Sequence, residues 1–196
     1  YELPDAARTA KGRALVNVLP LRDGERVQSV QATRDFSEHR FLVFATRKGQ
    51  IKKTELTAYN TPIKADGLIA IIIRDDDDLV SVRGTSGHDD IIMVSRSGQA
   101  AKFSEDKVRS MGRDTSGVRG MNVAQKDNYV LAMDVARHDQ DLLVVTENGF
   151  GKRTAMDDYP RKGRGAMGVK TITLTDRKGV LAAALAVREH QELVFI

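Results

Sequence analysis

The sequence predicts an all-β fold, a β-propeller or β-pinwheel built of four-stranded blades of about 51 residues and present here as a partial array. Three observations predict it. An apolar run with a turn glycine recurs along the chain, a second glycine recurs in the same register, and no segment holds a helical apolar period for three turns. Such repeats are typical of arrays in which one unit cannot bury its apolar face alone and must stack on its neighbours.

Each unit is expected to begin with a β-hairpin. Strand-like apolar runs at 42–46, 91–95 and 142–146 are each followed by a turn glycine. These glycines are Gly49, Gly98 and Gly149, and they lie 49 and 51 residues apart. Because glycine adopts a positive φ at little steric cost, each one predicts a tight turn between two strands.

Two further landmarks keep the same register. A glycine that opens another apolar stretch recurs at Gly12, Gly67, Gly117 and Gly168, and an apolar residue after a charged turn recurs at Val27, Leu79, Val130 and Leu181. Together the landmarks predict one domain over 1–196, with repeats at about 37–87, 88–137 and 138–189 and partial blades at 1–36 and 190–196. Since 192–196 matches 141–145, we expect a fragment of a longer array, which could be open, closed or completed by a second copy.

Composition narrows the class of protein. The chain has 196 residues, of which 41% are hydrophobic and 5% aromatic, so a sizeable core of small β-branched side chains is expected. It contains no Cys, which excludes disulfides and thiolate zinc sites and favours a reducing cytoplasm. No apolar stretch approaches the roughly 18 residues of a membrane span, so we expect no membrane association.

The net charge of +4 becomes informative through its placement, because basic residues recur at two positions of the repeat. The first position follows the turn glycine and comprises Lys52, Lys53, Lys102, Lys152 and Arg153. The second surrounds the later glycine and comprises Lys11, Arg13, Lys64, Arg113, Arg119, Arg161, Lys162, Arg164 and Lys170. Acids gather in other turns, notably Asp75 to Asp78. A basic stripe of this kind favours binding to nucleic acid phosphates without regard to sequence.

Three segments resemble the C-terminal domain family of bacterial DNA gyrase A. They are YELPDAARTAKG (1–12), VRSMGRDTSGVRG (108–120) and ENGFGKRT (147–154), and the resemblance extends through the chain. It implies a six-bladed β-pinwheel whose blades exchange strands and wrap double-stranded DNA around a basic rim. It further implies partners in the rest of gyrase A and in gyrase B, ATP-dependent negative supercoiling by the parent topoisomerase, and a place in the bacterial cytoplasm with the nucleoid.

The chain departs from the family at its characteristic box of glutamine, glycine and basic residues. The most similar segment is RKGRGAMG (161–168), in which Ala166 and Met167 stand where the box has glycine and a basic residue. We expect the box to precede Tyr1, and we expect this piece to bind DNA while bending it poorly. The resemblance places the catalytic tyrosine of the parent outside the chain, so no catalytic residue, metal or cofactor is expected here.

Other functions fit the sequence less well. The histidines at 39, 88, 138 and 190 recur once per unit, so they lie a blade apart and cannot share one metal ion. The glycines of 163–168 have dinucleotide-binding spacing but lack a βαβ context, and the acids at 75–78 lack the spacing of a calcium loop and predict a solvated turn. Two alternatives stay open: a propeller scaffold for protein interactions, and the related C-terminal DNA-binding domain of topoisomerase IV.

Overall fold

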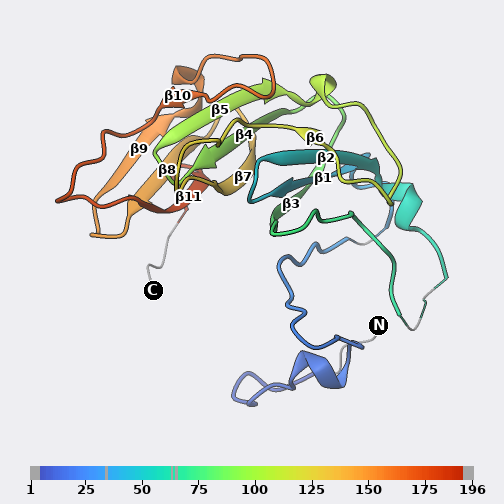
Figure 1. Cartoon of the computed structure of the whole chain (residues 1–196). Coiled ribbons are helices and arrows are strands. Elements are labelled where there is room, and N and C mark those ends of the chain that lie inside the picture. Colours follow the sequence, from blue (N-terminus) through green and yellow to red (C-terminus); the bar gives the residue numbers. More distant parts are fainter. Residues whose placement is uncertain (1–4, 34, 63, 65, 192–196) are drawn as a thin grey trace.

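The chain folds into three antiparallel sheets that lie side by side (Figure 1), as a computed structural model shows for residues 5–33, 35–62, 64 and 66–191. The strands are β1 (Phe41–Thr46), β2 (Gln50–Glu55), β3 (Leu79–Thr85), β4 (Asp90–Ser95), β5 (Gln99–Ser104), β6 (Val118–Arg119), β7 (Val130–Ala136), β8 (Asp141–Thr146), β9 (Gly151–Ala155), β10 (Val169–Lys170) and β11 (Leu181–Val187). The described residues also form four short 3-10 helices: η1 (Leu15–Asn17), η2 (Leu56–Tyr59), η3 (Glu105–Lys107) and η4 (Met156–Asp158). The described residues contain no α-helix, and the all-β prediction is confirmed.

Each sheet is built on a hairpin whose turn contains the first landmark glycine. The amide of Gly49 donates to the carbonyl of Thr46 at 3.0 Å, and the same bond joins Gly98 to Ser95 and Gly149 to Thr146. All three glycines have φ between 78° and 83°, as the sequence predicts. The long third strand of each unit, β3, β7 or β11, then pairs with the first strand of its hairpin.

The fourth strand of a sheet comes from the following unit. β6 lies after β5 in the chain but pairs with β2, and β10 lies after β9 but pairs with β5. The strand orders are therefore β3-β1-β2-β6, β10-β5-β4-β7 and β11-β8-β9. The strand exchange that the resemblance implies is present at both junctions, and within the described residues β9 receives no such strand.

The second landmark glycine is required where the exchanged strand begins. Gly117 and Gly168 have φ of 83° and 95°, and a Cβ on either would stand 2.4 Å from a carbonyl oxygen of the neighbouring strand, that of Ile51 or Ala100. Only glycine permits both this backbone conformation and this close approach. The glycine pattern in the sequence thus marks the points at which adjacent units interlock.

The core lies between adjacent sheets. One cluster joins Val43 and Ile51 of the first sheet to Ile91 and Phe103 of the second, and another joins residues such as Ile92 of the second sheet to those of the third. Burial between units instead of within them is what a stacked array requires. The described residues contain no helix long and apolar enough to cross a membrane.

The predicted partial blades lack strands in the described residues. In segments 5–33 and 35–40 the structure describes only η1, and the chain there lies apart from the sheets over much of its length in Figure 1. The later part of this stretch approaches β3, where Gln31 Nε2 donates to the carbonyl of Val82 at 3.0 Å. Of the segment 190–196, residues 192–196 lie outside the described residues.

Candidate nucleic-acid interface

Two lysines of the first basic position connect neighbouring units inside the protein. Lys53 and Lys102 are 6% and 8% exposed. Their ammonium groups donate to the carbonyls of Glu105, at 2.9 Å, and Met156, at 2.8 Å, which begin the 3-10 helices of the following units. The expectation that both side chains bind DNA is corrected accordingly, because their ammonium groups are enclosed and bonded to backbone oxygens.

Lys52 is also removed from the surface. Its side chain is fully buried, and its ammonium group donates to the carbonyls of Ala70 and Arg113 and lies 5.3 Å from the ring centre of Phe44. Burial lowers the pKa of Lys52 from 10.5 to about 8, although the nearby carboxylate of Asp114 acts in the opposite direction. The predicted DNA contact at Lys52 is therefore corrected to a structural one.

The free energy of unfolding should rise with pH as Lys52 loses its proton. The folded chain releases this proton near pH 8 and the unfolded chain near pH 10.5, so the unfolded state binds more protons between these values. We expect the wild type to gain about 2–3 kcal/mol over this window relative to Lys52→Met. Urea unfolding of both proteins at several pH values measures the difference, and parallel pH profiles would contradict the assignment.

The corresponding residues of the third unit are exposed because no exchanged strand covers β9 within the described residues. Lys152 Nζ donates to the carbonyl of Thr171 at 3.2 Å, and Arg153 forms an ion pair with Asp141 at 2.8 Å. Both side chains reach solvent. Thus one sequence position gives buried side chains in two units and exposed ones in the third.

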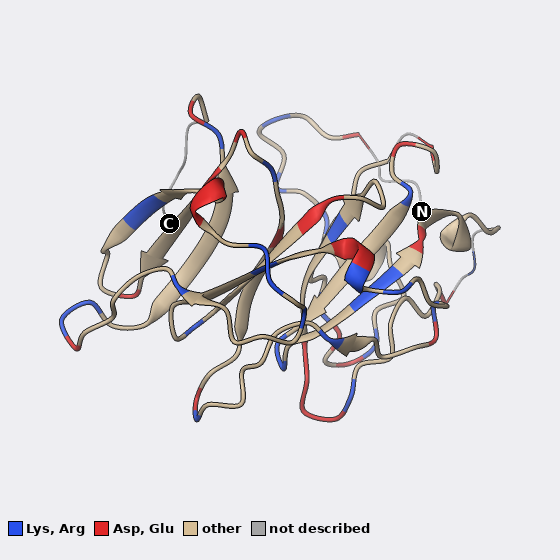
Figure 2. Cartoon of the chain, turned by 90° about the horizontal axis from the view of Figure 1, so that it is seen from above, with Lys and Arg blue, Asp and Glu red and all other residues tan. Residues whose placement is uncertain are grey.

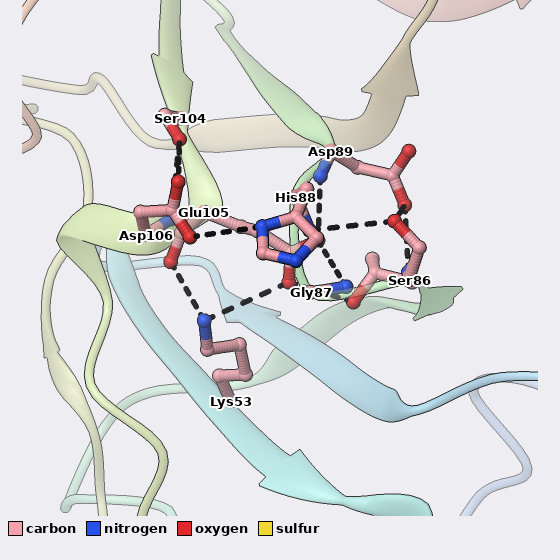
Figure 3. Close-up of polar contacts among 9 residues, drawn as sticks. Lys53, Ser86, Gly87, His88, Asp89, Ser104, Glu105 and Asp106 are labelled. Carbon is pink, nitrogen blue, oxygen red and sulfur yellow. Dashed lines mark hydrogen bonds and ion pairs between the residues drawn. The ribbon is translucent and has the colours of Figure 1, made fainter.

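A buried carboxylate organises the junction between the first two units (Figure 3). Glu105 is fully buried and lies 3.8 Å from Lys53 Nζ. Its oxygens accept hydrogen bonds from Thr85 Oγ1 and from the amides of Gly87 and Asp89. Leu56 and Met156 occupy the equivalent place in the other units, so no repeating signal in the sequence indicates this network.

The second basic position forms two equivalent loops, which we call rim loop 1 (residues 110–119) and rim loop 2 (residues 161–170). Each starts at a parallel bridge to a hairpin strand, Lys53 with Ser110 or Lys102 with Arg161, and each ends in the exchanged strand β6 or β10. Figure 2 shows basic residues both on strands and on the loops that connect the sheets, with acidic residues on η3 and η4 as well as on strands and turns. The loops thus carry their charges along the outer edges of adjacent sheets.

Within the rim loops, four basic side chains are available to a ligand. Arg119 and Lys170 are exposed and stand at equivalent positions in β6 and β10, while Lys162 is exposed and Arg113 is partly buried. None of these four side chains has a hydrogen bond or ion pair with another residue that the structure describes. The pattern gives cationic groups on both rim loops.

Two other arginines of rim loop 2 are engaged with protein groups. Arg161 is 62% exposed and forms an ion pair with Asp90 at 2.8 Å. Arg164 donates to the backbone carbonyls of Lys107 and Arg119. Sequence reasoning does not distinguish these from the available cations, because the distinction depends on contacts with another unit.

The remaining predicted residues precede the rim loops. Lys11 and Arg13 are exposed in the strandless N-terminal segment, and Lys64 is exposed in the long connection between η2 and β3. The structure does not bring these three residues into a rim loop. They are equivalent in sequence, but within the described residues the segments that carry them contribute no strand to a sheet.

The separation of acids from bases is less complete than the sequence suggests. Asp90, at the start of β4, pairs with Arg161, and Asp141, at the start of β8, pairs with Arg153, which sequence reasoning missed. Within the predicted solvated turn, Asp77 is buried and accepts from the amide of Lys48 at 2.8 Å, because it closes the nearby hairpin turn. His138 contacts Asp157 at 2.6 Å, and within the described residues no group of three or more ligating side chains could hold a metal ion.

Comparison with known proteins agrees with the fold and the repeat. Residues 1–34, 40–86, 89–136 and 140–188 match the family described as DNA gyrase C-terminal domain, beta-propeller. The DNA gyrase A protein of Salmonella typhimurium is 41% identical over 196 residues, and that of Escherichia coli is 39% identical. The alignments cover 100% of this chain, which spans 22% of the length of each relative.

Two solved structures share the architecture. The C-terminal domain of DNA topoisomerase IV superposes with a TM-score of 0.86 at 26% identity, over 96% of this chain and 58% of that one. The DNA gyrase A C-terminal domain gives 0.78 at 27% identity, over 92% of this chain and 60% of that one. With the repeat, the exchanged strands and the family match in agreement, the chain belongs to the DNA gyrase C-terminal domain family, which has a β-propeller fold.

Proposed function

We propose that the chain binds double-stranded DNA without sequence preference through rim loops 1 and 2. The observation that carries this proposal is the pair Arg119 and Lys170, two exposed cations without partners among the described residues, at equivalent positions of adjacent units. Arg113 and Lys162 add charge beside them. Cations repeated along an edge can neutralise successive phosphates of one backbone, which releases counterions and makes binding depend strongly on salt.

The same edge supports a role in DNA bending. A smooth bend costs on the order of 1–6 kcal/mol over 20–30 base pairs, so the contacts that hold it must be spread along an arc. Rim loops on adjacent units supply such a spread. By analogy with the gyrase relatives, the chain serves ATP-dependent negative supercoiling together with the rest of gyrase A and with gyrase B in the bacterial cytoplasm, and does not itself catalyse strand cleavage.

Replacing both Arg119 and Lys170 with glutamate should weaken DNA binding strongly and equally for unrelated sequences. The plot of log binding constant against log salt concentration should become less steep by about two units, because each lost phosphate contact reduces the steepness by about 0.9. Fluorescence anisotropy with two unrelated duplexes over a salt series measures both quantities.

The matched control replaces Lys126 and Arg137 with glutamate. Both residues are exposed and lie outside the rim loops, and replacing them changes the net charge by the same amount. Equal losses in the two double variants would mean that the overall charge, and not the rim loops, governs binding. A loss confined to one duplex sequence would contradict backbone recognition.

A second candidate function is DNA binding without chiral wrapping. The resemblance implies that the topoisomerase IV domain shares the blade but neither the gyrase box nor the wrapping, and the TM-score of 0.86 with that domain favours this candidate. Ligation of a nicked plasmid in the presence of the chain distinguishes the two functions. A linking-number shift in one direction supports wrapping with a fixed hand, and binding without a shift supports the second candidate.

A further inference from the structure

Arg164 carries one of the charges of rim loop 2, but its guanidinium group is occupied by backbone oxygens. Nε donates to the carbonyl of Lys107 at 2.9 Å, and Nη1 donates to the carbonyl of Arg119 at 3.0 Å. Lys107 lies in η3 and Arg119 in β6, whereas Arg164 belongs to the loop that ends in β10. One side chain therefore connects the two rim loops.

Backbone contacts surround this connection. The amide of Gly165 donates to the carbonyl of Gly120 at 2.6 Å, and the amide of Asn122 donates to the carbonyl of Ala166 at 3.0 Å. Rim loop 2 is thus hydrogen-bonded to residues 120–122, which directly follow Arg119. The carbonyl of Arg119 is held by Arg164 while its own side chain remains exposed.

We propose that Arg164 is a positioning residue of the DNA-binding surface. It holds rim loop 2 against β6 and thereby fixes the spacing between the phosphate contacts made by Arg119 and Lys170. This inference rests on the proposed function and assigns Arg164 a role other than contact with phosphate. Binding benefits because two contacts held in place lose less conformational freedom when DNA arrives.

The residue type fits this role. Arginine presents several donors in a rigid planar fork, so two different nitrogens of Arg164 donate to the two carbonyls, whereas a lysine would have to serve both from one flexible ammonium group. The residue one repeat earlier, Arg113, has no side-chain hydrogen bond to any residue that the structure describes. The connection is therefore specific to the junction of the two rim loops.

The test compares Arg164→Lys, which keeps the charge, with Lys162→Gln, which removes an available charge from the same loop. Anisotropy titrations over a salt series should show that Arg164→Lys binds about fivefold more weakly with an unchanged salt slope. Lys162→Gln should lower the slope by about one unit. In the free protein, the amides of Gly165 and Asn122 should exchange hydrogen faster in Arg164→Lys.

The possible results separate the two proposals. Wild-type affinity in Arg164→Lys would overturn the positioning role. So would a third variant, Arg164→Gln, if it lowered the salt slope by one unit while Arg164→Lys left the slope unchanged and bound as the wild type does, because that result would indicate a simple phosphate contact. Unchanged hydrogen exchange in Arg164→Lys would also overturn it. If the wild-type chain bound neither duplex at low salt, the proposed function would itself be overturned, and this inference with it.

Discussion

Replacing Glu105 with alanine should lower the free energy of unfolding by about 3–5 kcal/mol, the cost of breaking a buried ion pair by removing one partner. The carboxylate accepts hydrogen bonds from Thr85 Oγ1 at 2.8 Å, the Gly87 amide at 2.9 Å and the Asp89 amide at 2.8 Å. Lys53 Nζ lies 3.8 Å away and would lose its countercharge. Urea unfolding followed by circular dichroism measures the loss.

Two variants show whether this loss comes from the buried network. Asp106→Ala removes the neighbouring acid, whose side chain is 60% exposed, and should change the free energy by no more than about 0.5 kcal/mol. Replacing Lys53 and Glu105 together with methionine should restore only part of the stability, because the amides of Gly87 and Asp89 remain without an acceptor. A loss below about 1 kcal/mol in Glu105→Ala would show that water or other groups satisfy these donors.

The repeat made the fold predictable from the sequence. Gly49, Gly98 and Gly149 keep their spacing because each must adopt a positive φ in a hairpin turn, which is a local requirement that the order of residues reveals. The position of the rim loops is predictable for the same reason, since Gly117 and Gly168 mark both of them. The parts of the fold that the sequence indicates clearly are thus those where the local backbone conformation requires glycine.

The roles of the basic residues could not be predicted in this way. Lys52 and Lys53 are adjacent in a strand and point to opposite faces, so a simple alternation would expose one of them. Both are buried because the following unit and the chain at Ala70 cover the two faces of β2. Periodicity locates the charges, but burial depends on contacts between units, which differ between Lys52 and Lys152.

The strand exchange illustrates the same limit. β6 and β10 contain only two residues each, too few for a pattern of alternating burial. Their partners are decided by packing, because Val118 and Val169 lie against neighbouring strands that belong to the preceding unit. The resemblance to a known family therefore supplied the exchange, and the residues alone did not.

Replacing Gly168 with alanine should destabilise the protein by at least about 3 kcal/mol, because the new methyl group would collide with a backbone that cannot move independently. The new Cβ would stand 2.4 Å from the oxygen and 2.5 Å from the carbon of the Ala100 carbonyl. In addition, Gly168 has a φ of 95°, which alanine rarely adopts. Relief requires separation of β10 from β5, which also displaces Lys170. We expect faster hydrogen exchange in β10 and weaker DNA binding, besides a lower urea midpoint.

Gly67→Ala is the matched control, because Gly67 stands at the same position of an earlier repeat. Its φ is 69°, but a Cβ would have no neighbour within 4 Å. This variant therefore carries only the conformational cost of a left-handed alanine, about 1–2 kcal/mol. The difference between the two variants measures the close approach of adjacent units, and equal losses would mean that backbone conformation alone explains the recurring glycine.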